Sequence, residues 1–131
     1  MTTVVDQMEA LRAHLTAFEL PQLYSVHVSA APGEPTVTLQ LAARQAPPIA
    51  TGLLAWAHTL THATAEVWRV PRGDSIHPSV IGQLTKGVTI RVYGSLPFTQ
   101  RGPGADLAPG GSTTVPLAVL RHLAIPGEVA L

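Results

Sequence analysis

The sequence predicts an α+β domain with a mostly antiparallel sheet. A helix followed by two alternating strands is indicated over residues 1–43, and the same order recurs over residues 49–98 with two or three strands. Short turns can reverse a strand, whereas a parallel crossover needs a dozen residues or more. A chain of 131 residues with 46% hydrophobic residues also suits one domain with one core. We therefore expect four or five strands, two helices packed on one face and a short C-terminal helix.

The first helix is predicted over residues 4–17, because apolar residues recur there at spacings of three and four. Asp6 and Glu9 fall outside that stripe, and Pro21 prevents a helical continuation. The residues expected to face the core are Val4, Met8, Leu11 and Leu15.

A hairpin is expected after the first helix. Apolar residues alternate with Ser, Thr, His and Gln over residues 24–28 and 36–41, and Pro32 and Gly33 supply the turn. One face of this hairpin should be buried and the other hydrated. The second helix is predicted from the stripe formed by Ile49, Leu53, Ala57 and Leu60.

The strands of the second half expose different residues from those of the first. They are expected around residues 66–70, 76–81 and 88–93. Pro78 lacks an amide donor, so its strand should lie at a sheet edge or carry a bulge. If the aliphatic residues face the helices, the other sheet face displays Trp68, His77, Arg91 and Tyr93.

The domain predicted over residues 1–98 is followed by a change of composition. Gly, Pro and Ser dominate residues 99–114, which predicts a flexible linker. A short helix is expected over residues 115–125, and it must dock on its own domain or on another subunit because so short a helix is marginal alone. Residues 126–131 are expected to form a loose tail.

Composition and charge limit the function. Eight Lys and Arg balance eight Asp and Glu, so the whole molecule supplies no field that attracts phosphate. The absence of cysteine removes disulfides, thiolate zinc sites and a cysteine nucleophile. Asp6 and Glu9 interrupt the stretch where a signal sequence would be apolar, and no run approaches the ~20 apolar residues of a membrane span. We expect a cytoplasmic protein with no cofactor and no membrane partner.

The second half carries a candidate interaction face. It consists of Trp68, Arg69, Arg72, His77, Arg91 and Tyr93. Trp, Tyr and Arg are enriched at protein interfaces, so self-association or contact with another protein is the leading hypothesis. Aromatic rings and guanidinium groups also stack on bases, which makes a single-stranded nucleic acid a second, less favoured partner. A small-ligand site or an enzyme site around His77 is the third hypothesis.

Other motifs carry little chemistry. His58 and His62 have the spacing of two metal ligands on one helical face, but the zincin glutamate is absent and two histidines at a helix end explain the spacing. The Arg-Gly-Asp tripeptide at residues 72–74 is also what a hairpin turn requires. Asp, His and Ser occur over residues 74–79 without a nucleophile elbow. We therefore predict no catalytic residue and no metal ligand.

One pattern suggests a family. Trp68-Arg69-Val70-Pro71-Arg72-Gly73-Asp74, continued by His77, Gly82 and Val92-Tyr93-Gly94, resembles small actinobacterial α+β proteins over residues 11–98. The resemblance implies a bacterial source and attaches no activity or site residue. We expect a non-enzymatic protein-interaction module that forms a small homo-oligomer. The contact would use the candidate interaction face, the Pro78 strand or the C-terminal helix.

Overall fold

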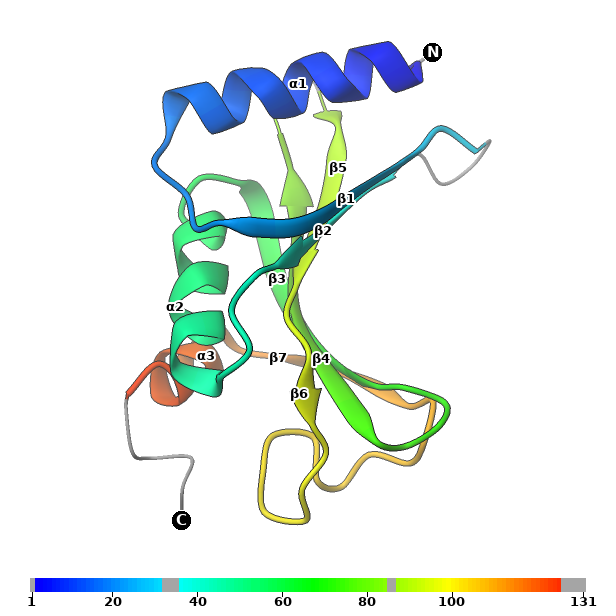
Figure 1. Ribbon diagram of the computed structural model, residues 1–131, viewed down its shortest axis with the longest axis vertical. Helices are drawn as coiled ribbons and strands as arrows, with labels where there is room; N and C mark the ends of the chain where they lie inside the picture. The colour runs from blue at the N-terminus through cyan, green and yellow to red at the C-terminus, as the bar shows by residue number, and fades with distance from the viewer. Residues whose placement is uncertain (1, 32–35, 85–86, 126–131) are drawn as a thin grey trace.

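The computed structural model describes residues 2–31, 36–84 and 87–125. Within them the chain is an α+β domain, as expected, but with seven strands in place of four or five (Figure 1). The elements are α1 (Val4–Ala17), β1 (Leu23–Ser29), β2 (Thr36–Leu41), α2 (Ala46–Ala57), β3 (Thr61–Arg69), β4 (Ser75–Gln83), β5 (Thr89–Tyr93), β6 (Leu96–Pro97), β7 (Ser112–Val115) and α3 (Leu117–Leu123).

All the strands belong to one open sheet, in the order β1-β2-β5-β4-β3-β7, and β6 pairs with β4. Neighbouring strands are antiparallel except β2 and β5, which run parallel. That pair joins the two halves of the chain, and the connection through α2, β3 and β4 is long enough for a parallel crossover. The repeated helix-strand-strand order therefore builds one sheet and one core.

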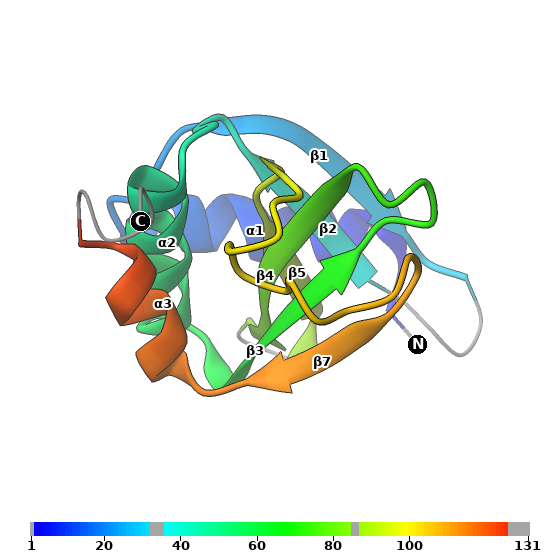
Figure 2. The same ribbon diagram turned by 90° about the horizontal axis from the view of Figure 1, so that it is seen from below.

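The core lies between the sheet and α2. Figure 2 shows α2 and α3 beside each other against the sheet, whereas α1 runs across one end of it (Figure 1). Prolines in the first turn of α2 suit its start, because amide groups there have no partner within the helix. Ile49, Leu53 and Ala57 of the expected stripe are buried, and Trp56 is fully enclosed. This helix is therefore the main cover of the sheet.

The first helix presents a different face to the core from the one expected. Leu11 is buried, but it is accompanied by Gln7 and His14. The Gln7 side-chain amide donates to the carbonyl of Ser29 over 2.8 Å, and His14 Nε2 lies 2.7 Å from the hydroxyl of Thr59. Polar side chains with such partners can be buried. The helix therefore faces the core with these residues, and its most apolar stripe points partly to solvent. The expected core residues that it leaves exposed are Val4, Met8 and Leu15.

The prediction that Pro78 marks an edge strand or a bulge is wrong. Its strand, β4, lies between β3 and β5, and Pro78 is buried. Pairing of β4 with β5 starts at Ser79, and pairing with β6 reaches only Ile76. The missing amide therefore falls in the gap between two partner strands, where no ladder hydrogen bond is lost.

The Gly- and Pro-rich segment is attached to the sheet. Residues 112–115 form β7 beside β3, whereas residues 112–114 were expected in a flexible linker and residue 115 at the start of the last helix. Arg69 donates its amide to Gly111 and accepts from Gly110, at 2.9 and 2.8 Å. The last helix, α3, docks on α2 of its own domain and buries Leu120 and Leu123. The tail predicted over residues 126–131 lies outside the described residues.

Candidate functional site

Three rings of the candidate interaction face come together on the open side of the sheet. Trp68 of β3 lies opposite His77 of β4, and Tyr93 of β5 lies beside them. The Trp68 and His77 rings meet edge to face with centroids 5.3 Å apart, and the His77 and Tyr93 rings stack at 4.7 Å. The Tyr93 hydroxyl donates to Gln40 Oε1 over 3.1 Å. We call Trp68, His77 and Tyr93 the aromatic row.

The aromatic row is close to electrically neutral. Burial, and secondarily the nearby Arg91 guanidinium, lower the pKa of His77 below its usual value, so the imidazole is uncharged at pH 7. Arg91 lies 3.7 Å from a Glu66 carboxylate oxygen and donates to the hydroxyl of Ser79. Its charge is thus already matched by a carboxylate on the same face. This arrangement favours contact with neutral groups over contact with phosphates.

The other two arginines of the predicted face lie elsewhere. Arg69 follows Trp68 in the strand and so points to the opposite side. It donates to the carbonyls of Gly73 and Leu107 at 3.0 and 2.8 Å, and its guanidinium lies 3.6 Å from the centre of the Phe98 ring. Arg72 sits in the β3–β4 turn with its side chain 88% exposed. The structure therefore brings together four of the six predicted residues.

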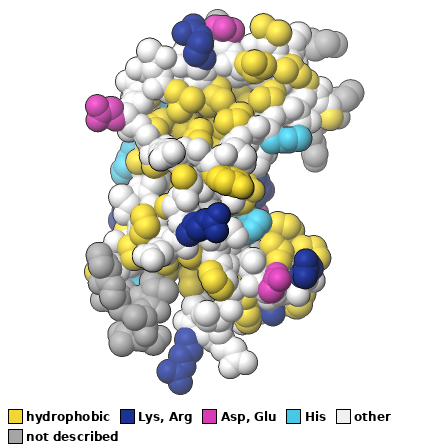
Figure 3. Space-filling view, in the orientation of Figure 1, with side chains coloured by type: hydrophobic (Ala, Val, Ile, Leu, Met, Phe, Trp, Pro, Cys, Tyr) yellow, Lys and Arg dark blue, Asp and Glu magenta, His cyan; other side chains and the backbone are white. Residues whose placement is uncertain are grey.

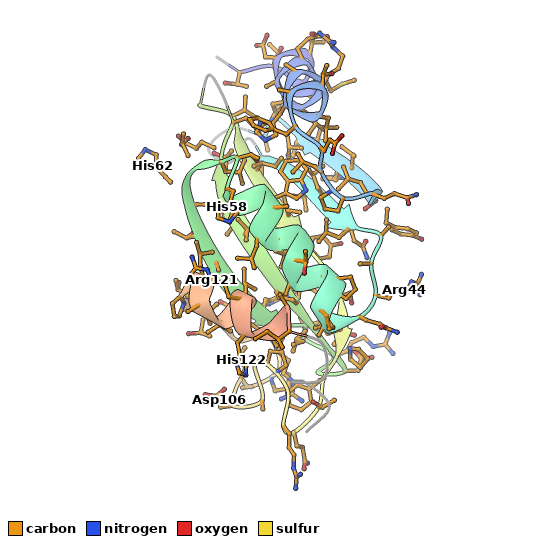
Figure 4. All side chains as sticks on the ribbon, turned by 90° about the vertical axis from the view of Figure 1, so that its left-hand side faces the viewer. Arg44, His58, His62, Asp106, Arg121 and His122 are labelled. Carbon is orange, nitrogen blue, oxygen red and sulfur yellow. The ribbon has the colours of Figure 1, made fainter. Side chains whose placement is uncertain are left out.

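A polar groove of about 460 Å³ adjoins the aromatic row at Gln40. It separates the end of β2 from the segment around β6, and Arg44 at its margin projects from the surface (Figure 4). Its polar side chains include Tyr24, Gln40, Arg44, Asp74, Ser75 and Ser95. The groove offers room for a small polar molecule, with a cation and an anion among its lining residues.

The largest unexpected feature is an apolar surface at the N-terminal end. Among the described residues eight large hydrophobic side chains are exposed, and seven of them lie between residues 4 and 26. Figure 3 shows hydrophobic side chains gathered over α1 and β1. We call this the N-terminal apolar surface, formed by Val4, Val5, Met8, Leu15, Phe18 and Val26; Tyr24 lines the groove beside Gln40 instead. Val4, Met8 and Leu15 belong to the helical stripe that periodicity alone assigned to the core.

The strand under this surface is an edge of the sheet. β1 pairs with β2, and no described strand pairs with its other side. Its sequence, LYSVHVS, has no Lys, Asp, Glu or Pro, and residues 24–27 are all exposed. At the opposite edge β7 has only four residues, three of them Ser or Thr. Natural edge strands are usually short, charged or interrupted by proline, so β1 is the less protected edge.

The remaining motifs form no reactive centre in the described part of the chain. α2 ends at Ala57, so His58 and His62 do not share a helical face, and Figure 4 shows His62 projecting from the start of β3. No hydrogen bond links Asp74 with His77 among the described residues, and no group of three potential ligands is placed there to hold a metal ion. The described helices include none that is long and apolar enough to span a membrane.

No family model, curated protein or solved structure matches the chain. The resemblance to small actinobacterial proteins therefore stays a prediction, and the functional assignment depends on the geometry of the structure.

Proposed function

We propose that this chain is a non-enzymatic protein-interaction module, a cytoplasmic bacterial protein that forms a small homo-oligomer through its N-terminal apolar surface. The observation that carries the proposal is that six of the eight large hydrophobic side chains exposed in the described part of the chain lie on α1, at its C-terminal end or at Val26 of β1. With about 150–200 Å² for a fully exposed large side chain, the six side chains of this surface expose roughly 500 Å². The largest apolar patch on a typical monomer is of this size, about 300–600 Å², and is often functional.

The aromatic row gives less support to an interaction than the N-terminal apolar surface does. Its rings already pack on one another, and Arg91 is paired with Glu66. A binder of single-stranded nucleic acid needs bases to stack on free rings and cations to contact phosphates. Arg69 is also engaged by two backbone carbonyls. The proposed docking surface is therefore the one on α1 and β1, in place of the sheet face predicted from the sequence.

The oligomeric state tests this proposal. Sedimentation velocity over a concentration series should show a small oligomer that dissociates on dilution. Met8→Glu places a charge in the surface and should shift the protein to monomer at concentrations where the unmodified chain is associated. Two variants serve as controls: Ile125→Glu changes the exposed hydrophobic residue outside the surface, and Trp68→Ala changes the aromatic row. Both control variants should associate as the unmodified chain does. If the unmodified chain is a monomer at every concentration, the proposal is refuted.

A small polar ligand in the groove beside Gln40 is the second candidate, favoured by the groove's volume and by its polar lining. Thermal unfolding in the presence of amino acids, nucleosides and sugars provides a test. A ligand that belongs to the groove should raise the Tm of the unmodified chain and lose that effect in Ser95→Ala. Failure of every compound to raise the Tm would count against a site for these classes.

A further inference from the structure

We infer that the occupant of the N-terminal apolar surface is a second copy of this chain, with β1 pairing antiparallel to β1 of the other copy about a two-fold axis. The inference rests on the proposed function and adds the mode of contact. The two seven-stranded sheets would join into one continuous sheet through their β1 edges.

The backbone of β1 supplies the first step. An edge strand presents unpaired amide and carbonyl groups to any strand that can approach. β1 has seven residues and no charged side chain, so two copies meet without repulsion between like charges. The carbonyl of Ser29 at its end already accepts from Gln7, so the pairing would use the residues before it. Antiparallel pairing of a strand with its own copy is a two-fold, self-complementary contact, which is the commonest form of protein dimer. The short edge strand β7 offers four residues for such pairing.

The position of Val26 supplies the second step. Val26 and Val28 lie opposite Leu39 and Val37, and both of those partners are buried on the helix side of the sheet. Val26 should therefore point to the helix-covered side, yet it is 49% exposed. The helices of one copy thus leave β1 partly uncovered. Val26 can be buried only if a second chain covers this strand.

A second copy provides that cover. Rotation about an axis normal to the sheet keeps both α1 helices on the same face, so α1 of the other copy arrives over the edge where Val26 is bare. The flank of α1 that carries exposed apolar residues is formed by Val4, Met8 and Leu15. Glu9 and Arg12 of the same helix are exposed and pair with each other at 3.1 Å, which suits the polar rim of an interface. One arrangement thus buries the strand edge, Val26 and the helix flank together.

The apolar area in this arrangement is smaller than that of a standard interface. Val4, Met8, Leu15 and Val26 expose roughly 300 Å² per copy, and a standard interface buries about 800 Å² per partner. The rest of the contact must come from the backbone edge of β1 and the polar atoms around it.

Single-cysteine variants test the pairing, because the chain has no cysteine of its own. Ser25→Cys, Val26→Cys and His27→Cys place a thiol at successive positions of β1, and Thr114→Cys places one on β7 as a matched edge control. In an antiparallel pair each step from the axis separates a residue from its own copy by ~7 Å more. A disulfide requires Cα atoms within about 7 Å. After mild oxidation, the yield of disulfide-linked dimer should therefore be high for one of the three β1 variants and much lower for the other two.

Amide hydrogen exchange measures the same edge without any substitution. The amides of β1 should become at least about tenfold better protected at concentrations where the chain is associated than where it is monomeric. Those of β7 should not change. A cross-linking maximum in β1 with this protection supports the inference.

The outcomes separate the inference from the proposed function. If the chain associates and Met8→Glu dissociates it, but β1 shows neither cross-linking nor protection, the pairing is wrong and the interaction surface stands. Cross-linking through Thr114→Cys instead would place the contact at β7 and overturn the inference. A chain that stays monomeric refutes both.

Discussion

At the scale of single residues, the unusual feature is a buried polar anchor on α1, formed by His14. His14 is buried against Trp56, with ring centroids 5.4 Å apart and nearly parallel planes, and it shares a hydrogen bond with Thr59. Desolvation lowers the pKa of His14 below its usual 6.5. The neutral imidazole is thus part of the packing that holds α1 to the end of α2.

This anchor predicts a dependence of stability on pH. Because the pKa of His14 is lower in the folded state, the unfolded chain takes up a proton first as the pH falls. The free energy of unfolding should therefore decrease as the pH falls from 8 through 6.5 to 5, by at most about 1.4 kcal/mol per pH unit for each such histidine. His77 contributes in the same direction.

Urea unfolding at pH 8 and pH 5 measures the effect. His14→Phe removes the titrating group and keeps a ring against Trp56, so it should show a smaller loss of stability between the two pH values. His58→Phe is an exposed control and should keep the full loss. Equal losses in the unmodified chain and in His14→Phe would contradict the assignment.

A second prediction concerns Gly94, where a side chain has no room. A Cβ atom at this position would lie 2.5 Å from Ile49 Cγ2, in the interior of the core. Gly94→Ala should destabilise the fold by roughly 1–3 kcal/mol, because the packed core must shift to accept a methyl group. Ser95→Ala, one residue further on, is the control and should change the denaturation midpoint little. An unchanged midpoint in Gly94→Ala would show that the core yields more easily than its packing implies.

At the scale of secondary structure, the sequence predicted where the helices and strands lie better than it predicted which of their faces are buried. The core stripe of α2 was correct because that helix is apolar enough for any rotation to bury most of it, and Ile49 and Leu53 dominate the contact. The stripe of α1 was wrong because hydrophobicity reports neither a hydrogen bond from Gln7 to a distant strand nor a histidine stacked on Trp56. These partners are far away in sequence, so no local pattern reveals them.

The candidate site shows the same division. Strand alternation correctly placed Trp68, His77, Arg91 and Tyr93 on one face, since that depends only on local geometry. The same alternation puts Arg69 on the opposite side from Trp68, so its inclusion in the face was wrong; what local geometry does not reveal is its contacts with Phe98 and Leu107 on a later segment. The N-terminal apolar surface was missed for a related reason: an apolar stripe looks the same whether it faces its own core or another chain.

Arg69 yields a prediction at this scale. It ties the β3–β4 turn and residues 99–111 to the sheet through two carbonyl acceptors and the Phe98 ring. Arg69→Ala should lower stability by roughly 2–3 kcal/mol, as expected when charge-assisted hydrogen bonds and packing are lost together. It should also make the chain more readily cut by trypsin after Arg101. Arg72→Ala, at an exposed position in the same turn, should stay within about 0.5 kcal/mol of the unmodified chain. Equal trypsin sensitivity in the two variants would argue against a role for Arg69 in holding this segment.

At the scale of the whole molecule, the two halves differ in what they leave exposed. The second half covers its sheet with α2 and α3 on one side and self-paired rings on the other. The first half ends the sheet with an uncharged edge and a helix whose apolar flank is bare. With a formal net charge of zero, the whole molecule supplies no net field to attract a partner. The proposed association therefore relies on short-range apolar contact and backbone pairing.

That distinction predicts how association responds to salt. Because the N-terminal apolar surface has few charges, the dimer dissociation constant should change by less than about threefold between 50 and 500 mM NaCl, and sulfate should strengthen association by favouring burial. A phosphate-binding surface would instead lose affinity by orders of magnitude over that range. Sedimentation equilibrium measures the constant, and Trp fluorescence with a single-stranded oligonucleotide at low salt is the parallel control, expected to show no quenching. A steep loss of self-association with salt would mean that charged groups such as Glu9 and Arg12 form the contact, with the apolar flank of α1 outside it.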